Sequence, residues 1–138
     1  MTARERELLQ NLKDYMILKT DVESLTEKLR SAEYKTTATY GNTGGSGGYG
    51  GSKVESFSIR VMESRRELIR KRNLIDSIDM AIENAELSKR EKELIVLTMG
   101  GLSLSSYARQ KNIYKSHVYK IRDRALKKMV DYIYRNTK

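Results

Sequence analysis

Residues 102–129, LSLSSYARQKNIYKSHVYKIRDRALKKM, contain the most informative pattern in this sequence. Ala108 is small enough for two helices to cross beside it, and Asn112 tolerates the positive φ that a tight turn requires. Three apolar residues then stand at the spacings that hold a second helix against the first: Ile113, Val118 and Ile121. This spacing predicts a helix-turn-helix in which a short helix precedes a longer one.

The longer helix is expected to have one apolar face and one polar face. Its inward residues are predicted to be Ile113, Val118, Ile121, Ala125, Leu126 and Met129, with Leu104 and Tyr107 completing the buried side of the short helix. Its outward face is predicted to carry Lys115, Ser116, Tyr119, Lys120, Asp123 and Lys127. A polar helix face of this kind fits the major groove of duplex DNA.

From Leu87 to about Met129 the chain resembles region four of bacterial sigma factors. The shared order of parts is a charged helix opening, a glycine turn, the LSLSSYA helix and a second helix closing in RALKK. Lys111 stands where that family usually has a packed Leu, and Asn112 replaces a Gly. The whole layout, paired helices followed by a glycine-rich break and a sigma-like end, is similar to the ArpU/RinA-like group of phage late transcriptional regulators.

These resemblances imply a sequence-specific regulator of a phage or prophage, and an activator of late genes, in the cytoplasm of a bacterial host cell. Residues expected at base edges are Lys115, Ser116, Tyr119 and Lys120. Residues expected at phosphates are Ser105, Ser106, Arg109, Lys111, Tyr114, His117 and Arg124. Two roles stay open for Arg122, Arg124 and Lys128. They could contact DNA phosphates, or they could contact RNA polymerase, which the resemblance to a sigma domain allows as a further partner.

The net charge is divided unevenly along the chain. Residues 1–87 contain 14 Lys and Arg and 14 Asp and Glu, whereas residues 88–138 contain 13 and 4, so the whole excess of +9 lies in the second part. A phosphate backbone requires such an excess, although an anionic membrane or an acidic protein would also attract it. The segregation favours double-stranded DNA as the partner.

Two long helices are predicted before residue 88. Apolar residues from 8 to 32 recur in steps of three and four, which predicts one helix from about Thr2 to Lys35 with Asn11 in its seam. A second helix is predicted from Lys53 to about Glu86. Between them, residues 40–52 contain seven of the nine glycines, and we expect a flexible connection there because the run lacks phosphate-loop spacing. The expected product is a long antiparallel, coiled-coil-like helical hairpin.

Ser88 followed by Glu91 predicts a capping box, at which a new helix begins. The expected organisation is therefore all-α, with a helical hairpin at 1–87 and a helix-turn-helix domain at 88–138. A homo-oligomer is expected, with a dimer favoured, because a single small helix-turn-helix reads few base pairs.

Several classes of function are not expected from this sequence. There is no Cys, His117 is the single His, and no catalytic triad, ligand cluster or phosphate loop is present, so no enzyme, metal or cofactor is expected. The charged first residues and the absence of a long apolar run predict a soluble intracellular protein with no membrane partner. Two other functions stay open: a DNA-recognition subunit of a phage packaging terminase, and an RNA polymerase-binding adaptor.

Overall fold

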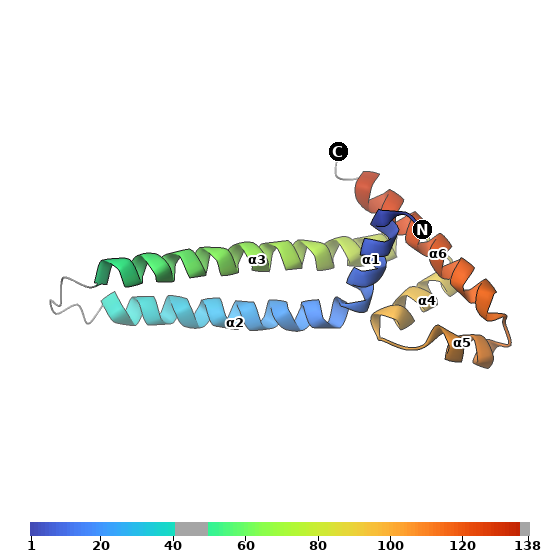
Figure 1. Ribbon diagram of the computed structural model, residues 1–138, viewed down its shortest axis with the longest axis horizontal. Coiled ribbons are helices and arrows are strands. Elements are labelled where there is room, and N and C mark those ends of the chain that lie inside the picture. The colour runs from blue at the N-terminus through green and yellow to red at the C-terminus, as the bar shows by residue number, and fades with distance from the viewer. Residues whose placement is uncertain (41–49, 136–138) are drawn as a thin grey trace. The chain divides into compact units, whose positions relative to one another are not determined.

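Helices make up the regular structure of the described residues (Figure 1). The computed structural model describes residues 1–40 and 50–135, with side chains for residues 1–32 and 57–135. Within these ranges the helices are α1 (Ala3–Lys13), α2 (Tyr15–Tyr40), α3 (Gly50–Asn84), α4 (Lys89–Met99), α5 (Leu104–Lys111) and α6 (Lys115–Arg135), and no strand occurs. The expected all-α class is therefore confirmed.

The chain divides into two compact units at positions that the sequence did not indicate. One unit contains residues 1–18 and 74–138, and the other contains residues 19–73. The first unit thus includes the start of the chain and the end of α3, in addition to the segment after residue 87. Apolar burial explains this division, because α1 and the last turns of α3 carry core residues such as Leu12, Ile78 and Ala81, all 0% exposed.

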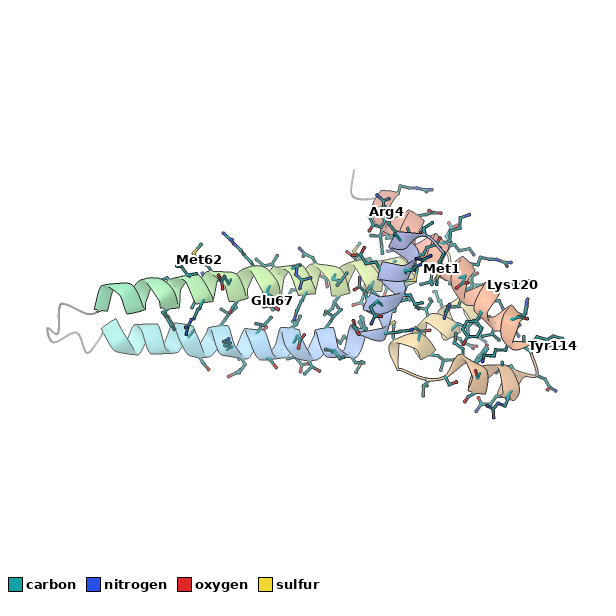
Figure 2. All side chains as sticks on the ribbon, in the orientation of Figure 1. Met1, Arg4, Met62, Glu67, Tyr114 and Lys120 are labelled. Carbon is teal, nitrogen blue, oxygen red and sulfur yellow. The ribbon has the colours of Figure 1, made fainter. Side chains whose placement is uncertain are left out.

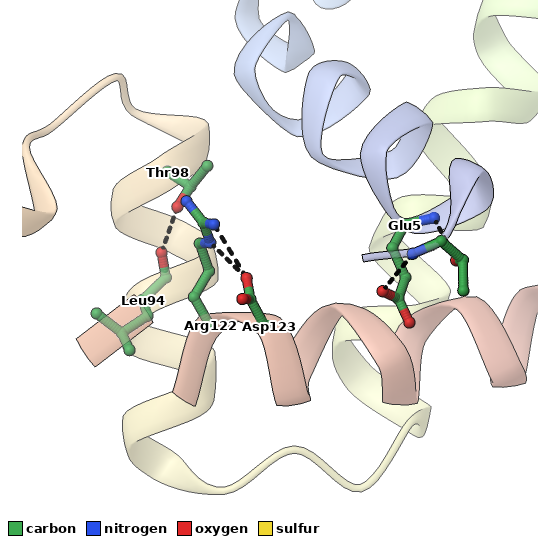
Figure 3. Close-up of polar contacts among 6 residues, drawn as sticks. Glu5, Leu94, Thr98, Arg122 and Asp123 are labelled. Carbon is green, nitrogen blue, oxygen red and sulfur yellow. Dashed lines mark hydrogen bonds and ion pairs between the residues drawn. The ribbon is translucent and has the colours of Figure 1, made fainter. Parts of the chain in front are cut away.

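A break at Asp14 separates α1 from α2, so the prediction of one helix from 2 to 35 is wrong. Asp14 has φ −89° and ψ 1°, and its N–H donates to the carbonyl of Gln10. The break allows α1 to contact α4 and α6, where Leu8, Leu9 and Leu12 are buried. The other end of α1 is fixed by a Thr2–Glu5 capping box, which Figure 3 shows beside Glu5.

Tyr15 fastens the start of α2 to α3 within the first unit. Its hydroxyl donates to Asp79 Oδ1 at 2.6 Å, and the residue is 5% exposed. Burial, together with the hydrogen bond to Asp79 and that carboxylate's charge, raises the pKa of Tyr15 to about 12. The hydroxyl therefore stays protonated and keeps donating at neutral pH.

The capping box that was predicted at the start of α4 is confirmed. Ser88 Oγ accepts from the N–H of Glu91 at 3.2 Å, and Glu91 Oε1 accepts from the N–H of Ser88 at 3.3 Å. The same Oε1 accepts from Lys128 Nζ of α6 at 2.8 Å, which joins the start of α4 to α6. Near the other end of α4, Thr98 Oγ1 donates to the carbonyl of Leu94 at 2.8 Å (Figure 3).

In the second unit α2 and α3 lie side by side, as Figure 1 shows. Lys71 of α3 reaches Asp21 of α2 at 2.7 Å and Glu67 of its own helix at 3.1 Å. α2 continues to Tyr40 and α3 begins at Gly50, so residue 40 and residues 50–52 of the predicted glycine-rich connection belong to helices. Residues 41–49, on which the predicted hairpin connection falls, lie outside the described residues.

Candidate nucleic-acid interface

A tight turn connects α5 to α6 in the first unit. Ser103 caps α5, since its Oγ accepts from the N–H of Ser106 at 3.4 Å. Asn112 follows α5 with φ 56° and ψ 43°, the left-handed region that the sequence required of it. The N–H of Ile113 then donates to the carbonyl of Ala108 at 3.0 Å, which closes the end of α5. The chain leaves this turn in the direction of α6.

A hydrophobic cluster holds α5 and α6 against α4. Its buried members are Leu94, Leu104, Tyr107, Ala108, Val118 and Ile121, and Leu97, Ile113 and Tyr119 pack against it half-buried. The predicted inward residues Val118, Ile121, Ala125, Leu126 and Met129 are all buried, which confirms that face of α6. Ile113 is the exception, because it is only half-buried at the turn.

Tyr107 adds a polar link to this cluster. Its hydroxyl donates to Glu93 Oε2 of α4 at 3.0 Å. Burial raises the pKa of Tyr107, and the hydrogen bond to Glu93 and its charge raise it further. The link between α5 and α4 is therefore maintained at neutral pH, and it supports the helix that precedes the turn.

The residues predicted at base edges divide into two groups. Lys115, Ser116 and Lys120 are exposed on the first turns of α6, and Figure 2 shows Lys120 projecting outward from that helix. Tyr119 differs, because it is half-buried and packs against the hydrophobic cluster. Three of the four predicted residues are thus exposed, and the fourth packs partly against the hydrophobic cluster.

Most of the residues predicted at phosphates lie at or near the turn, and Arg124 lies further along α6. Ser106, Arg109, Lys111, Tyr114, His117 and Arg124 are exposed, and Ser105 is half-buried. Tyr114 is 85% exposed, an unusual position for a large aromatic side chain, and it stands at the tip of the turn (Figure 2). An open hollow of about 660 Å³ brings together Ser105, Arg109, Tyr114 and Lys115 around Asn112. The other predicted phosphate residues do not line this hollow.

Comparison of the chain with protein-family models, curated proteins and solved structures found no match.

A stack of charged and aromatic side chains on α6 was not foreseen. The Arg122 guanidinium lies 4.9 Å from the centre of the Tyr119 ring, and Lys115 Nζ lies 5.9 Å from it. Arg122 also donates to Asp123 Oδ1 at 3.0 Å and 3.2 Å, as Figure 3 shows. The Arg122 side chain is 12% exposed, so this arginine is used within the domain. The signal available in the sequence was the three-residue spacing of Tyr119 and Arg122.

Lys128 is occupied in a similar way by Glu91. Burial acts to raise the pKa of Glu91, but the hydrogen bonds from Lys128 and Ser88 outweigh burial and lower that pKa below its ordinary value. Glu91 is 5% exposed and its carboxylate is therefore charged and paired inside the unit. Of the three residues with two open roles, only Arg124 is exposed.

Residues 1–40 and 50–135 contain no group of three or more His, Cys, Asp or Glu side chains that could hold a metal ion. None of the helices in the same part of the chain combines the length and the apolar character that crossing a membrane requires.

Proposed function

We propose that the chain is a sequence-specific, DNA-binding transcriptional regulator whose α5–α6 region binds the duplex. The observation that carries this proposal is the exposed cationic face of α6 beside the hollow at the turn. Lys115 and Lys120 stand on that face, while Arg109 and Tyr114 stand at the hollow. The opposite face of α6 is buried, so these groups are held on a rigid support, which favours recognition of a defined surface.

The dimensions of α6 suit the groove of B-DNA. A helix with its side chains is about 10–12 Å across, and the major groove is about 12 Å wide. α6 begins at Lys115, so its first two turns would reach base edges through Lys115, Ser116 and Lys120. Lysine recognises guanine acceptors as a point charge, and serine accepts or donates to any base. Sequence preference is assigned to these three side chains.

Phosphate contacts supply most of the affinity in this proposal. Arg109, Lys111, Tyr114 and Arg124 are exposed around the turn and along α6. Each cation that neutralises a phosphate releases condensed counterions, so binding weakens as salt rises. His117 is also exposed at the start of α6 and is assigned to the same phosphate set.

The biological context rests on the resemblance to sigma region four and to phage late regulators. It supports a phage or prophage activator of late genes that works in the cytoplasm of a bacterial host, with RNA polymerase as a second partner. A homodimer would place two α6 helices in half-sites one helical turn apart. Light scattering tests this arrangement: a ring of many subunits would overturn the dimer and favour a packaging terminase subunit.

In-vitro selection of bound DNA from a random duplex library tests the proposed function. The full chain at moderate salt is expected to enrich a defined site. Lys120→Ala should relax the preference at one base position, whereas the matched variant Lys111→Ala should weaken binding evenly and reduce the slope of log K against log salt by about one. Loss of affinity that is identical for both variants on every sequence would contradict the assigned base-reading face. No enrichment together with retained polymerase binding would favour the adaptor function.

A further inference from the structure

The outer side of α3 in the second unit carries large apolar side chains in solvent. Ile59, Met62 and Ile69 are 56%, 53% and 59% exposed. Their spacings of three and seven residues place them on one strip of the helix. Figure 2 shows Met62 pointing away from α2. Lys71, which contacts α2 through Asp21, follows Met62 by nine residues and so lies about 180° around the helix axis.

Arginines accompany these apolar residues on the same side. Arg66 falls within the strip, Arg70 lies about 20° beyond its Ile59 edge, and Arg72 lies about 60° beyond its Ile69 edge. All three are exposed. Of the acids in this part of the helix, Glu67 lies about 80° from the Ile59 edge of the strip and pairs with Lys71, whereas Glu63 lies about 40° from that edge, beside Arg70. We define the α3 strip as Ile59, Met62, Arg66, Ile69, Arg70 and Arg72.

The composition of the α3 strip restricts what could cover it. If the α3 helices of two copies packed antiparallel through this strip and crossed at Ile69, Arg66 of one copy would lie close to Arg72 of the other. The repulsion between these like charges would cost electrostatic energy. Nucleic acid would satisfy the arginines but would leave three large aliphatic side chains exposed. A membrane interface favours a wide face that includes Trp, Phe or Leu, and the strip contains none of these residues.

We propose that the α3 strip docks an amphipathic helix with acidic edges from a partner protein. The apolar side of such a helix would cover Ile59, Met62 and Ile69, and its Glu or Asp residues would pair with Arg66, Arg70 and Arg72. Helix-against-helix recognition of this kind uses apolar anchors at steps of three, four and seven residues, which is the spacing of the strip. The proposal is independent of DNA binding by α6.

A synthetic probe tests the proposal with the full-length chain. The probe is a labelled peptide of about three heptads with Leu at positions a and d and Glu at e and g, and its matched control has Lys in place of Glu. Fluorescence anisotropy should detect salt-sensitive binding of the Glu peptide and none of the Lys peptide. Absence of binding by the Glu peptide would overturn the proposal.

Variants then locate the binding surface. Met62→Ser with Ile69→Ser, and separately Arg66→Gln with Arg70→Gln, should each weaken peptide binding by about tenfold or more. These side chains point away from α2, so circular dichroism should show unchanged helicity. The matched control Lys115→Gln with Lys120→Gln removes the same charge from α6 and should leave binding unchanged. An equal loss in the control would show that attraction depends on net charge alone, which overturns the proposal.

Other occupants of the strip give different results. Co-sedimentation of the chain with anionic phospholipid vesicles, abolished by Arg66→Gln with Arg70→Gln, would overturn the proposal in favour of a membrane surface. A dimer in light scattering that dissociates on Ile69→Glu would overturn it in favour of a second copy. Loss of duplex DNA affinity in the arginine variant, without loss of peptide binding, would assign the strip to nucleic acid.

Discussion

Replacement of Lys128 by Met is expected to destabilise the first unit by about 2 kcal/mol at neutral pH. Lys128 Nζ lies 2.8 Å from Glu91 Oε1, and the Glu91 side chain is 6% exposed. The buried Oε2 of Glu91 has no hydrogen-bond partner among the described residues, so removal of Lys128 leaves Ser88 as the remaining donor to this carboxylate. Breaking a fully buried pair costs about 3–5 kcal/mol. The Lys128 side chain is 39% exposed, which lets water replace part of the lost interaction and reduces the cost to about 2 kcal/mol.

The pH dependence of this cost identifies its cause. In the wild-type chain, burial raises the pKa of Glu91 but Lys128 and Ser88 bring it below the ordinary value of 4.5. The contribution of Glu91 to stability is therefore complete above that ordinary value and is lost as pH falls through the folded-state pKa. In Lys128→Met the main lowering interaction is absent, and burial raises the pKa. The difference in free energy of unfolding between the wild-type chain and Lys128→Met should be largest at neutral pH and should become smaller in acid.

Urea denaturation measures the difference in free energy of unfolding between the wild-type chain and Lys128→Met. A chain with two compact units need not unfold in one step, so amide hydrogen exchange in α4 and α6 is needed to assign this difference to the first unit. Lys127→Met is the matched control. Lys127 is the exposed neighbour of Lys128 on α6, and its replacement should change the free energy of unfolding by less than about 0.5 kcal/mol. Equal effects of the two substitutions at neutral pH, or a Lys128→Met cost that persists undiminished in acid, would refute this reasoning.

Three further predictions concern the turn, the second unit and the stacked side chains. Asn112→Gly should preserve stability, while Asn112→Val should lower the free energy of unfolding by about 1–2 kcal/mol, because a β-branched residue is strained at a φ of 56°. Equal thermal unfolding temperatures for the two variants would contradict this. Asp21→Asn should cost up to about 1 kcal/mol in urea unfolding. Asp21 and then Glu67 raise the pKa of Lys71, so this cost should disappear as pH rises through that pKa, and persistence above it would count against the ion pair. Tyr119→Phe keeps the aromatic ring under Lys115 and should retain DNA sequence preference, whereas Tyr119→Leu should loosen that preference. If both variants select the same DNA sites, the ring does not position Lys115.

Local signals in the sequence predicted much of the region after residue 87. Ser88 and Glu91 form the expected capping box, and Asn112 has the expected positive φ, because both features depend on groups within four residues. The buried face of α6 was also predictable, because apolar residues that recur every 3.6 residues mark the buried side of a helix, whichever element packs against it. Each of these features is decided by the chain's own neighbours in sequence.

Long-range packing decided the features that sequence could not predict. Nothing at Asp14 marks a break, because no Gly or Pro stands there and the apolar steps of three and four continue from Leu12 through Tyr15 to Leu18. The break follows from contacts of α1 with α4 and α6, which bury Leu9 in addition to Leu8 and Leu12. A seam that is periodic along the sequence is thus compatible with two helices that pack on different partners.

The position of the acidic groups matters more to the candidate interface than the net charge does. Only four acids occur after residue 87, and three of them have partners within the first unit: Glu91 with Lys128, Glu93 with Tyr107, and Asp123, whose side chain is 42% exposed, with Arg122. Among the described side chains, no acid lines the hollow at the turn, where Arg109 and Lys115 stand. The contacts that stabilise the unit therefore pair these carboxylates with groups away from the hollow, where we propose that a phosphate binds. A chain of equal net charge with an acid at the turn would lose positive potential at the hollow, and a count of residues could not reveal the difference.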